Sequence, residues 1–345
     1  MNPNLLGRRL LPALALGLLV FAALGAYADI RQMGRAVLGF PWALFGPILG
    51  LTLFNYLLRF GKWAYFLGRL EIRGLRPADS LLIFFGGLAM VITPGKVGEW
   101  VKAYLLERYT GVPFARTAPI VVAERLTDGL ALLLLAAAGL ARFGIGLPVA
   151  VGVLLLAAAV VGVALNRQAG ELAARLVGRL PGLGRYAHWV REFHGGANIL
   201  FRPQSLALGT LLGLISWSGE CLAFYLVLWG LGAEGGFDLL VKSAFILSVA
   251  SLGSSLMLSP GGLGVAEGGI TGLSQLLVGL GPAQAAVGAL LIRLGTLWFG
   301  VAVGVAALGI LSAREPGYRK GSSSSSNSSS SEKDSSEYTP TSRPW

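Results

Sequence analysis

Long apolar blocks, separated by short basic segments, run along most of this chain. Two examples are LPALALGLLVFAALGAYA, which begins at Leu11, and LPVAVGVLLLAAAVVGVAL, which begins at Leu147. Each is long enough to cross a bilayer as a helix, which takes about 20 residues. The pattern predicts six full spans, over 10–28, 41–60, 116–141, 147–165, 204–231 and 283–311.

Two further apolar regions, 79–107 and 241–280, are each interrupted near the middle by a Pro-Gly pair. The pieces on either side are mostly too short to span. Non-helical backbone at membrane depth survives only where protein or a polar cavity covers it. We therefore expect two re-entrant hairpins, each entering and leaving on one side. The alternative is two kinked or tilted full spans in each region.

Composition agrees with an all-α polytopic membrane protein. Hydrophobic residues make up 54% of the chain and charged residues 13%, where soluble domains have about 25% charged residues. The mean hydropathy is +0.68. The net charge of +11 indicates basic cytoplasmic loops and not nucleic-acid binding. A single cysteine, and two histidines without a cysteine cluster, predict no disulfide within the chain, no metal site and no cofactor.

Loop charge predicts the orientation of the spans. Both termini and the basic segments are expected in the cytoplasm, and the connections 29–40, 142–146 and 232–240 outside. Arg31 and Arg35 are exceptions. The basic residues assigned to the cytoplasm are Arg8, Arg9, Arg59, Lys62, Arg69, Arg73, Arg76, Arg167, Arg175, Arg179, Arg185, Arg191, Arg202, Arg314, Arg319 and Lys320.

Two segments lie outside this membrane core. Residues 166–203 have helical spacing of apolar positions with arginines opposite, which predicts an amphipathic segment along the inner membrane surface. A solvated connector is the alternative. The Ser-rich stretch at 316–345 is expected to be a disordered cytoplasmic tail, which leaves 1–315 as the transmembrane domain.

The interrupted region occurs twice. TPGKVGEW, ending at Trp100, resembles SPGGLGVAEGG, ending at Gly269, and Pro94 and Pro260 occupy matching places. From Glu99 onward, a constant offset of 168 residues relates Glu99 to Glu267 and Arg125 to Arg293. The repeat units, about 79–141 and 241–311, have opposite orientations in the predicted topology. Broken helices in an inverted repeat are a common plan of secondary transporters.

Depth makes the two arginines functional candidates. Each lies nine or ten residues into its predicted span, roughly 14–15 Å deep and near the midplane. An arginine there is costly unless it is paired or hydrated. For Arg125, a purely structural pair with Asp128 is an alternative, and Glu124 is its neighbour in sequence. Arg293 has no acid within a turn, so its partner is Glu267 or a ligand.

Other intramembrane residues have two interpretations. Glu220, in SWSGECL, either serves proton coupling or forms a hydrogen bond within a Ser-rich interface. Lys102 and Arg108 are expected to extend to the cytoplasmic surface. The two Pro-Gly pairs either create a binding site or are simply tight turns.

The paired motifs resemble the flippase-like transmembrane family, also known as the lysylphosphatidylglycerol synthase transmembrane region. The resemblance rests on PGKVGEWVKAYLLERYTGVPFARTAPIVVAERLTDGLALLLL, SPGGLGVAEGGI and LLIRLGTLWFG, and it covers nearly all of the chain except the Ser-rich tail. Relatives with several domains add a soluble aminoacyl-transferase domain. The resemblance therefore implies the lipid-translocating part in the cytoplasmic membrane, with membrane lipids as its partners.

Broken helices also suggest how an anionic headgroup is bound. Helix N-termini present backbone N–H groups to anions, and an arginine fork suits phosphate. The expected substrate-binding residues are Arg125, Arg293, Lys96, Glu99, Glu267, Gly95, Gly98, Gly261 and Gly264, and those with structural or coupling roles are Pro94, Pro260, Glu124, Asp128 and Glu220.

Three classes of function compete. The first is a flippase for a phospholipid or lipid-linked precursor. The second is a membrane enzyme, which the sequence disfavours because both histidines lie in the cytoplasmic segment, away from any mid-membrane nucleophile. The third is a non-transporting scaffold or regulator that docks an envelope-biosynthesis enzyme through residues 166–203.

Overall fold

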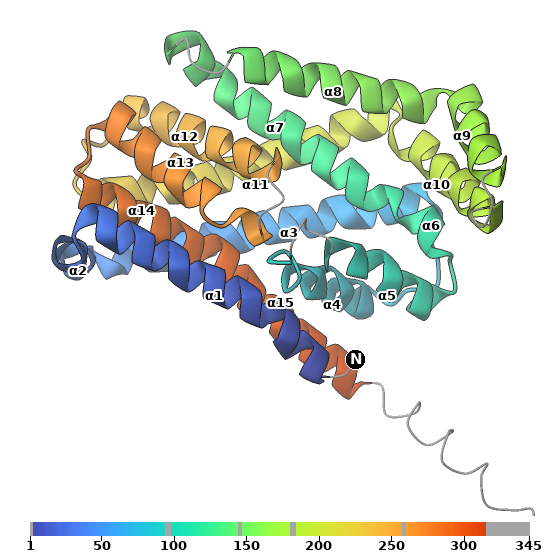
Figure 1. Ribbon diagram of the computed structural model, residues 1–345, viewed down its shortest axis with the longest axis horizontal. Helices are drawn as coiled ribbons and strands as arrows, with labels where there is room; N and C mark the ends of the chain where they lie inside the picture. Colours follow the sequence, from blue (N-terminus) through green and yellow to red (C-terminus); the bar gives the residue numbers. More distant parts are fainter. Residues whose placement is uncertain (1–2, 94–97, 144–146, 180–183, 257–259, 315–345) are drawn as a thin grey trace, which may run out of the picture.

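A computed structural model describes residues 3–93, 98–143, 147–179, 184–256 and 260–314. Within these ranges every regular element is helical, so the all-α prediction is confirmed. Figure 1 shows the long helices packed side by side in one bundle. The predicted tail at 316–345 and the residues Pro94, Gly95 and Lys96 lie outside the described residues.

Helices cover all six predicted spans. They are α1 (Pro3–Ala28), α3 (Phe45–Arg69), α7 (Pro119–Phe143), α8 (Leu147–Leu165), α11 (Pro203–Gly230), and α14 (Pro282–Arg293), which continues through the π-helical turn η6 (Leu294–Trp298) into α15 (Phe299–Ala313). Proline at the first position of α11 and α14 fits helix initiation, where no N–H partner is needed.

One span is longer than expected. The second was predicted to end at residue 60, but α3 continues to Arg69. Arg59 and Lys62 therefore belong to the bundle and not to a cytoplasmic loop, and their assignment as topology signals was wrong. Lys62 is 1% exposed. Its carboxylate partner comes from another helix, so the local sequence gave no indication of burial.

The first predicted outside connection is also helical. Residues Ile30–Gly39 form α2, which is bent by 99° from α1. The Asp29 carboxylate accepts a hydrogen bond from the N–H of Arg31 and caps this helix. Met33 is the buried residue of α2, so the segment packs as a short amphipathic helix.

Length and composition identify several membrane-spanning candidates among the described residues. Four helices qualify, over Trp42–Arg69, Pro203–Gly230, Phe237–Ser255 and Pro282–Ala313, and the bent pair α1–α2 would be a fifth. The third of these includes the first branch of an expected re-entrant hairpin. The re-entrant form of that hairpin stays a prediction, with a full crossing of the membrane as its alternative.

Both Pro-Gly regions form a helix, a break and a second helix. The first consists of α4 (Pro77–Leu88) and α5 (Val101–Thr110), which pack against each other. The second consists of α12 (Phe237–Leu256), the short turn η4 (Pro260–Gly262), α13 (Val265–Leu273) and the π-helical turn η5 (Ser274–Val278). Figure 1 shows the two hairpins toward opposite ends of the bundle.

The repeat is visible in the backbone. Gly111 ends α5 with a left-handed φ of 71°, and its N–H donates to the Glu107 carbonyl. Gly279 ends η5 with a φ of 80°, and its N–H donates to the Gln275 carbonyl, which is equivalent at the offset of 168. In Figure 1, α7 and the equivalent α14–α15 run in opposite directions, as an inverted repeat requires.

The segment at 166–203 forms two helices at one end of the bundle. These are α9 (Arg167–Arg179) and, after the turn η3 (Gly184–Tyr186), α10 (Ala187–Leu200). Gly196 of α10 packs against the backbone of Arg116 in the short helix α6 (Phe114–Thr117). α10 is therefore anchored to the first repeat unit, and α9 packs on α10.

The first hairpin touches the last helix at very close range. A Cβ added at Gly304 of α15 would lie 2.8 Å from the Phe85 carbonyl oxygen and still closer to the Ala89 nitrogen. Backbone atoms cannot rotate away, so only glycine allows this contact. Gly309, on the same helix, has nothing within 4 Å of such a Cβ.

We predict that Gly304→Ala lowers the free energy of unfolding by about 1–3 kcal/mol through overpacking. The matched change Gly309→Ala should leave it equal or slightly raised, because alanine favours helices. Chemical unfolding in detergent, followed by circular dichroism, measures both. Equal stability of the two variants would contradict the close approach of α4 and α15.

Candidate functional site

A cavity of about 440 Å³ lies at the centre of the bundle. Helices from both repeat units line it, together with α3 and α11. Its charged lining residues are Arg59, Glu99, Arg125, Asp128, Glu220 and Arg293. Arg125 and Arg293 both line this one cavity, and their role in binding a ligand stays a prediction. Its volume lies within the range of ligand sites, about 300–1,000 Å³.

In the second repeat unit, Arg293 and Glu267 form a tightly held pair. Arg293 Nε donates to Glu267 Oε1 at 2.6 Å, and Arg293 Nη2 donates to the Gly261 carbonyl at 2.6 Å. Glu267 Oε2 accepts the N–H of Gly264 at 2.6 Å. One carboxylate therefore caps the start of α13 and neutralises the arginine. Glu267 was correctly identified as the candidate partner of Arg293.

The equivalent pair in the first unit is looser. Arg125 Nε lies 2.9 Å from Glu99 Oε2, but Arg125 Nε and Glu99 Oε1 are buried without an aligned hydrogen bond among the described residues. The Arg125 side chain is 34% exposed and that of Arg293 16%. Arg125 is thus the more accessible of the two guanidinium groups.

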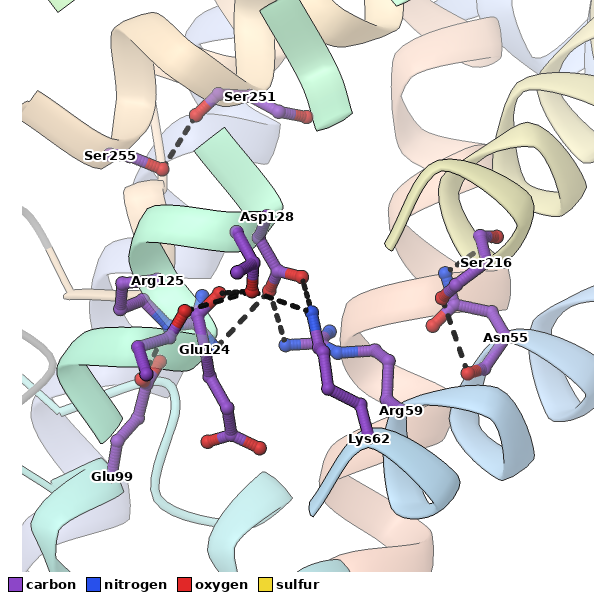
Figure 2. Close-up of polar contacts among 12 residues, drawn as sticks. Asn55, Arg59, Lys62, Glu99, Glu124, Arg125, Asp128, Ser216, Ser251 and Ser255 are labelled. Atoms are coloured by element: carbon purple, nitrogen blue, oxygen red, sulfur yellow. Dashed lines mark hydrogen bonds and ion pairs between the residues drawn. The ribbon is translucent and has the colours of Figure 1, made fainter. Parts of the chain in front are cut away.

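Asp128 is not the main partner of Arg125. The nearest contact between them, from Nη2 to Oδ2, is 3.9 Å. Asp128 instead binds α3, since Lys62 Nζ donates to Oδ1 at 2.5 Å and Arg59 Nη2 donates to Oδ2 at 3.2 Å. Figure 2 shows Asp128 between Lys62 and Arg59 on one side and Arg125 with Glu99 on the other.

Glu124 faces away from the cavity and pairs with Lys102 of α5. Both side chains are buried, and the Lys102 ammonium lies 5.0 Å from the Trp63 ring centre and 5.4 Å from that of Phe84. The expectation that Lys102 extends to the membrane surface was wrong. Its carboxylate partner and the two aromatic faces hold it inside the bundle.

Arg59 was not predicted from the sequence as a site residue. It lines the cavity from α3, and its guanidinium lies 6.0 Å from the Trp217 ring centre. Its sequence neighbours Lys62 and Arg69 made it look like part of a basic loop. The one available signal was its spacing from Lys62, which places both on one helix face.

The glycines of the two breaks have different roles. Gly261 lines the cavity, whereas Gly98 and Gly264 are absent from its described lining. The Gly98 N–H donates to Thr93 Oγ1 at 2.7 Å, and Gly264 has a φ of 87° at the N-cap of α13. Both glycines therefore shape their turns. Pro260 begins the turn η4.

Glu220 lines the cavity from α11, beside Tyr56 of α3. This placement favours the proton-coupling interpretation over a hydrogen bond within a Ser-rich interface. α11 is fixed on α3 by two reciprocal bonds: Asn55 Nδ2 donates to the Ser216 carbonyl and Ser216 Oγ donates to the Asn55 carbonyl. Figure 2 shows this pair beside the charged cluster.

Tyr56 ties α3 to the second repeat unit. Its hydroxyl donates at 2.5 Å to the Thr296 carbonyl in the π-helical turn that follows Arg293. π-Helical turns are rare and occur frequently at functional sites.

Among the described residues, no group of three His, Cys, Asp or Glu side chains could hold a metal ion.

Comparison with known proteins shows similarity over most of the chain. Residues 14–304 match the family described as the Lysylphosphatidylglycerol synthase TM region. The chain is also similar to a UPF0104 membrane protein of Methanothermobacter thermautotrophicus. The two are 26% identical over 236 residues, which cover 61% of this chain and 68% of that protein.

We predict that Lys102 and Glu124 act as one buried unit. Lys102→Met or Glu124→Gln alone leaves a buried partner unpaired and should cost about 3–5 kcal/mol in the free energy of unfolding. The double variant should cost clearly less than the sum of the two. Chemical unfolding in detergent measures the cycle.

The exposed pair Glu171–Arg175, whose charged atoms are 3.9 Å apart on α9, is the matched control. Glu171→Gln and Arg175→Met should each change stability by less than about 1 kcal/mol. Strictly additive losses for Lys102 and Glu124 would show that the pair contributes no coupling energy.

Proposed function

Since this chain belongs to the family of the lysylphosphatidylglycerol synthase TM region, we propose that it is a flippase of the cytoplasmic membrane. In this proposal it moves a phospholipid or lipid-linked precursor between the two leaflets. It catalyses no covalent change, and both termini lie in the cytoplasm. The headgroup phosphate binds Arg125 and Arg293 in the central cavity.

The convergence of two equivalent arginines on one cavity carries this proposal. Each comes from one repeat unit, and each faces a carboxylate 26 residues earlier in the chain. In the empty site, the carboxylates compensate the guanidinium groups, which are costly to bury unpaired. A phosphate replaces those contacts with charge-assisted hydrogen bonds to the arginine fork.

The difference between the two pairs suggests an order of events. Arg125 is more exposed and has no aligned hydrogen bond at Nε within the described part of the chain, so it is the first to receive the headgroup. Arg293 is held by Glu267 and the Gly261 carbonyl. We propose that the second hairpin opens when Arg293 leaves these acceptors for phosphate. Movement of one repeat unit against the other then completes alternating access.

A scaffold function is the second candidate. It is favoured by the exposed leucines of α9, Leu172 at 54% and Leu176 at 53%, which lie one helical turn apart. Arg175 and Arg179 belong to the same helix. In this alternative α9 docks an envelope-biosynthesis enzyme, and the cavity is not used for transport.

Replacing the arginines separates the two candidates. We predict that Arg125→Met or Arg293→Met weakens phosphate binding by about 1.5–3 kcal/mol, or roughly ten- to a hundredfold, because a charged hydrogen bond is lost. Arg→Lys should rescue in part, since a point charge lacks the fork. Lipid translocation in proteoliposomes is the measurement.

Arg175→Met, on the exposed face of α9, is the matched control and should translocate lipid at the wild-type rate. Monodisperse purification checks that every variant is folded. If both cavity variants fold and move lipid normally, the arginines are structural. The scaffold function would then be the better explanation.

A further inference from the structure

Glu220 is a buried carboxylate without an ion-pair partner among the described residues. It lies ten residues before the end of α11 at Gly230, about 15 Å of helix rise from that end. It is 7% exposed and lines the central cavity. Among the described residues, no hydrogen bond or ion pair joins its carboxylate to another side chain.

The charged and titratable groups around Glu220 already have partners. Tyr56 and Arg59 face it from α3, Asp128 from α7 and Arg293 from α14, and Cys221 follows it on α11. Arg59 binds Asp128, Arg293 binds Glu267, and the Tyr56 hydroxyl donates to Thr296. α12 contributes serine side chains, but no charged side chain, to the described lining of the cavity. Glu220 is therefore left without a cation of its own.

The charge balance of the cluster depends on Glu220. Apart from it, the ion-paired groups of the cluster among the described residues are five cations and four carboxylates: Arg59, Lys62, Lys102, Arg125 and Arg293, with Glu99, Glu124, Asp128 and Glu267. With Glu220 ionised these charges cancel. With Glu220 protonated, one positive charge is in excess, and it matches one monoanionic phosphodiester.

We propose that Glu220 is a proton-binding site and that the cavity takes up one proton together with each anionic headgroup. This inference rests on the proposed function of the same cavity. The proton comes from water and forms the carboxylic acid of Glu220, so no other reactant is needed. An anionic phosphodiester and an ionised Glu220 would compete for the same excess positive charge in a site of low dielectric constant. Because the two anions exclude each other, the headgroup binds when Glu220 is protonated. The proton is then the coupling ion.

Calorimetry on the full chain in detergent tests this directly. The ligand is dihexanoyl phosphatidylglycerol, whose phosphodiester does not titrate near neutral pH. Titrations in two buffers of different ionisation enthalpy give the number of protons taken up for each lipid bound. The wild type should take up about one proton, and its affinity should fall by about tenfold per pH unit as the pH rises through the titration of Glu220.

Two variants assign the proton to Glu220. E220Q should bind with a pH-independent affinity and take up no proton. E234Q removes an exposed carboxylate on the connection after α11 and should behave as the wild type. Proton uptake that persists in E220Q would place the site elsewhere and overturn the assignment.

The wild-type titration alone decides the remaining cases. Binding without proton uptake at any pH overturns the coupling and leaves the proposed phosphate site intact, whether or not E220Q folds. No binding of the lipid at any pH overturns the proposed phosphate site itself. The two failures are therefore distinguishable.

Discussion

A charge inside a membrane bundle must lie next to an opposite charge, and this requirement governs how the helices of the protein meet. Lys62 of α3 contacts Asp128 of α7, and Lys102 of α5 contacts Glu124 of α7. Removing either partner would leave an uncompensated buried ion. α7 therefore joins α3 to the first hairpin through two acids that lie one helical turn apart. The stretch from Glu124 to Asp128 also carries Arg125, which lines the cavity.

The Glu–Arg pairs extend this requirement to the cavity itself. In both repeat units a glutamate just after the helix break reaches an arginine 26 residues later. The pair thus ties a broken hairpin to the long helix that follows it. In the second unit the glutamate also caps α13, and the arginine also binds the Gly261 carbonyl. In the first unit the Arg125 side chain is 34% exposed, against 16% for Arg293, so the two equivalent arginines differ in accessibility.

The sequence predicted the repeat, and with it most of the site, because the offset of 168 residues relates Glu and Arg positions that chance seldom aligns in an apolar chain. Arg125 and Arg293 were placed at one cavity on that basis, and Glu267 was one of the two partners considered for Arg293, the other being a ligand. Arg59 and Lys62 were missed because charge near the end of an apolar block normally indicates a loop. Their compensating acid, Asp128, lies 69 residues after Arg59 and 66 after Lys62, and that separation carries no local signal. The partner of Arg125 was also ambiguous, since Asp128 lies one helical turn away in sequence while Glu99 is nearer in space.

In the proposed function, the two arginines of the repeat hold the phosphate of a lipid within the bundle. A structure of the protein in nanodiscs made with anionic phospholipid tests it most directly. We expect phosphate density within hydrogen-bonding distance of the Arg125 guanidinium, on the side of the cavity that faces Arg293. A well-resolved cavity without headgroup density, with lipid phosphates only at the two membrane surfaces, would contradict it.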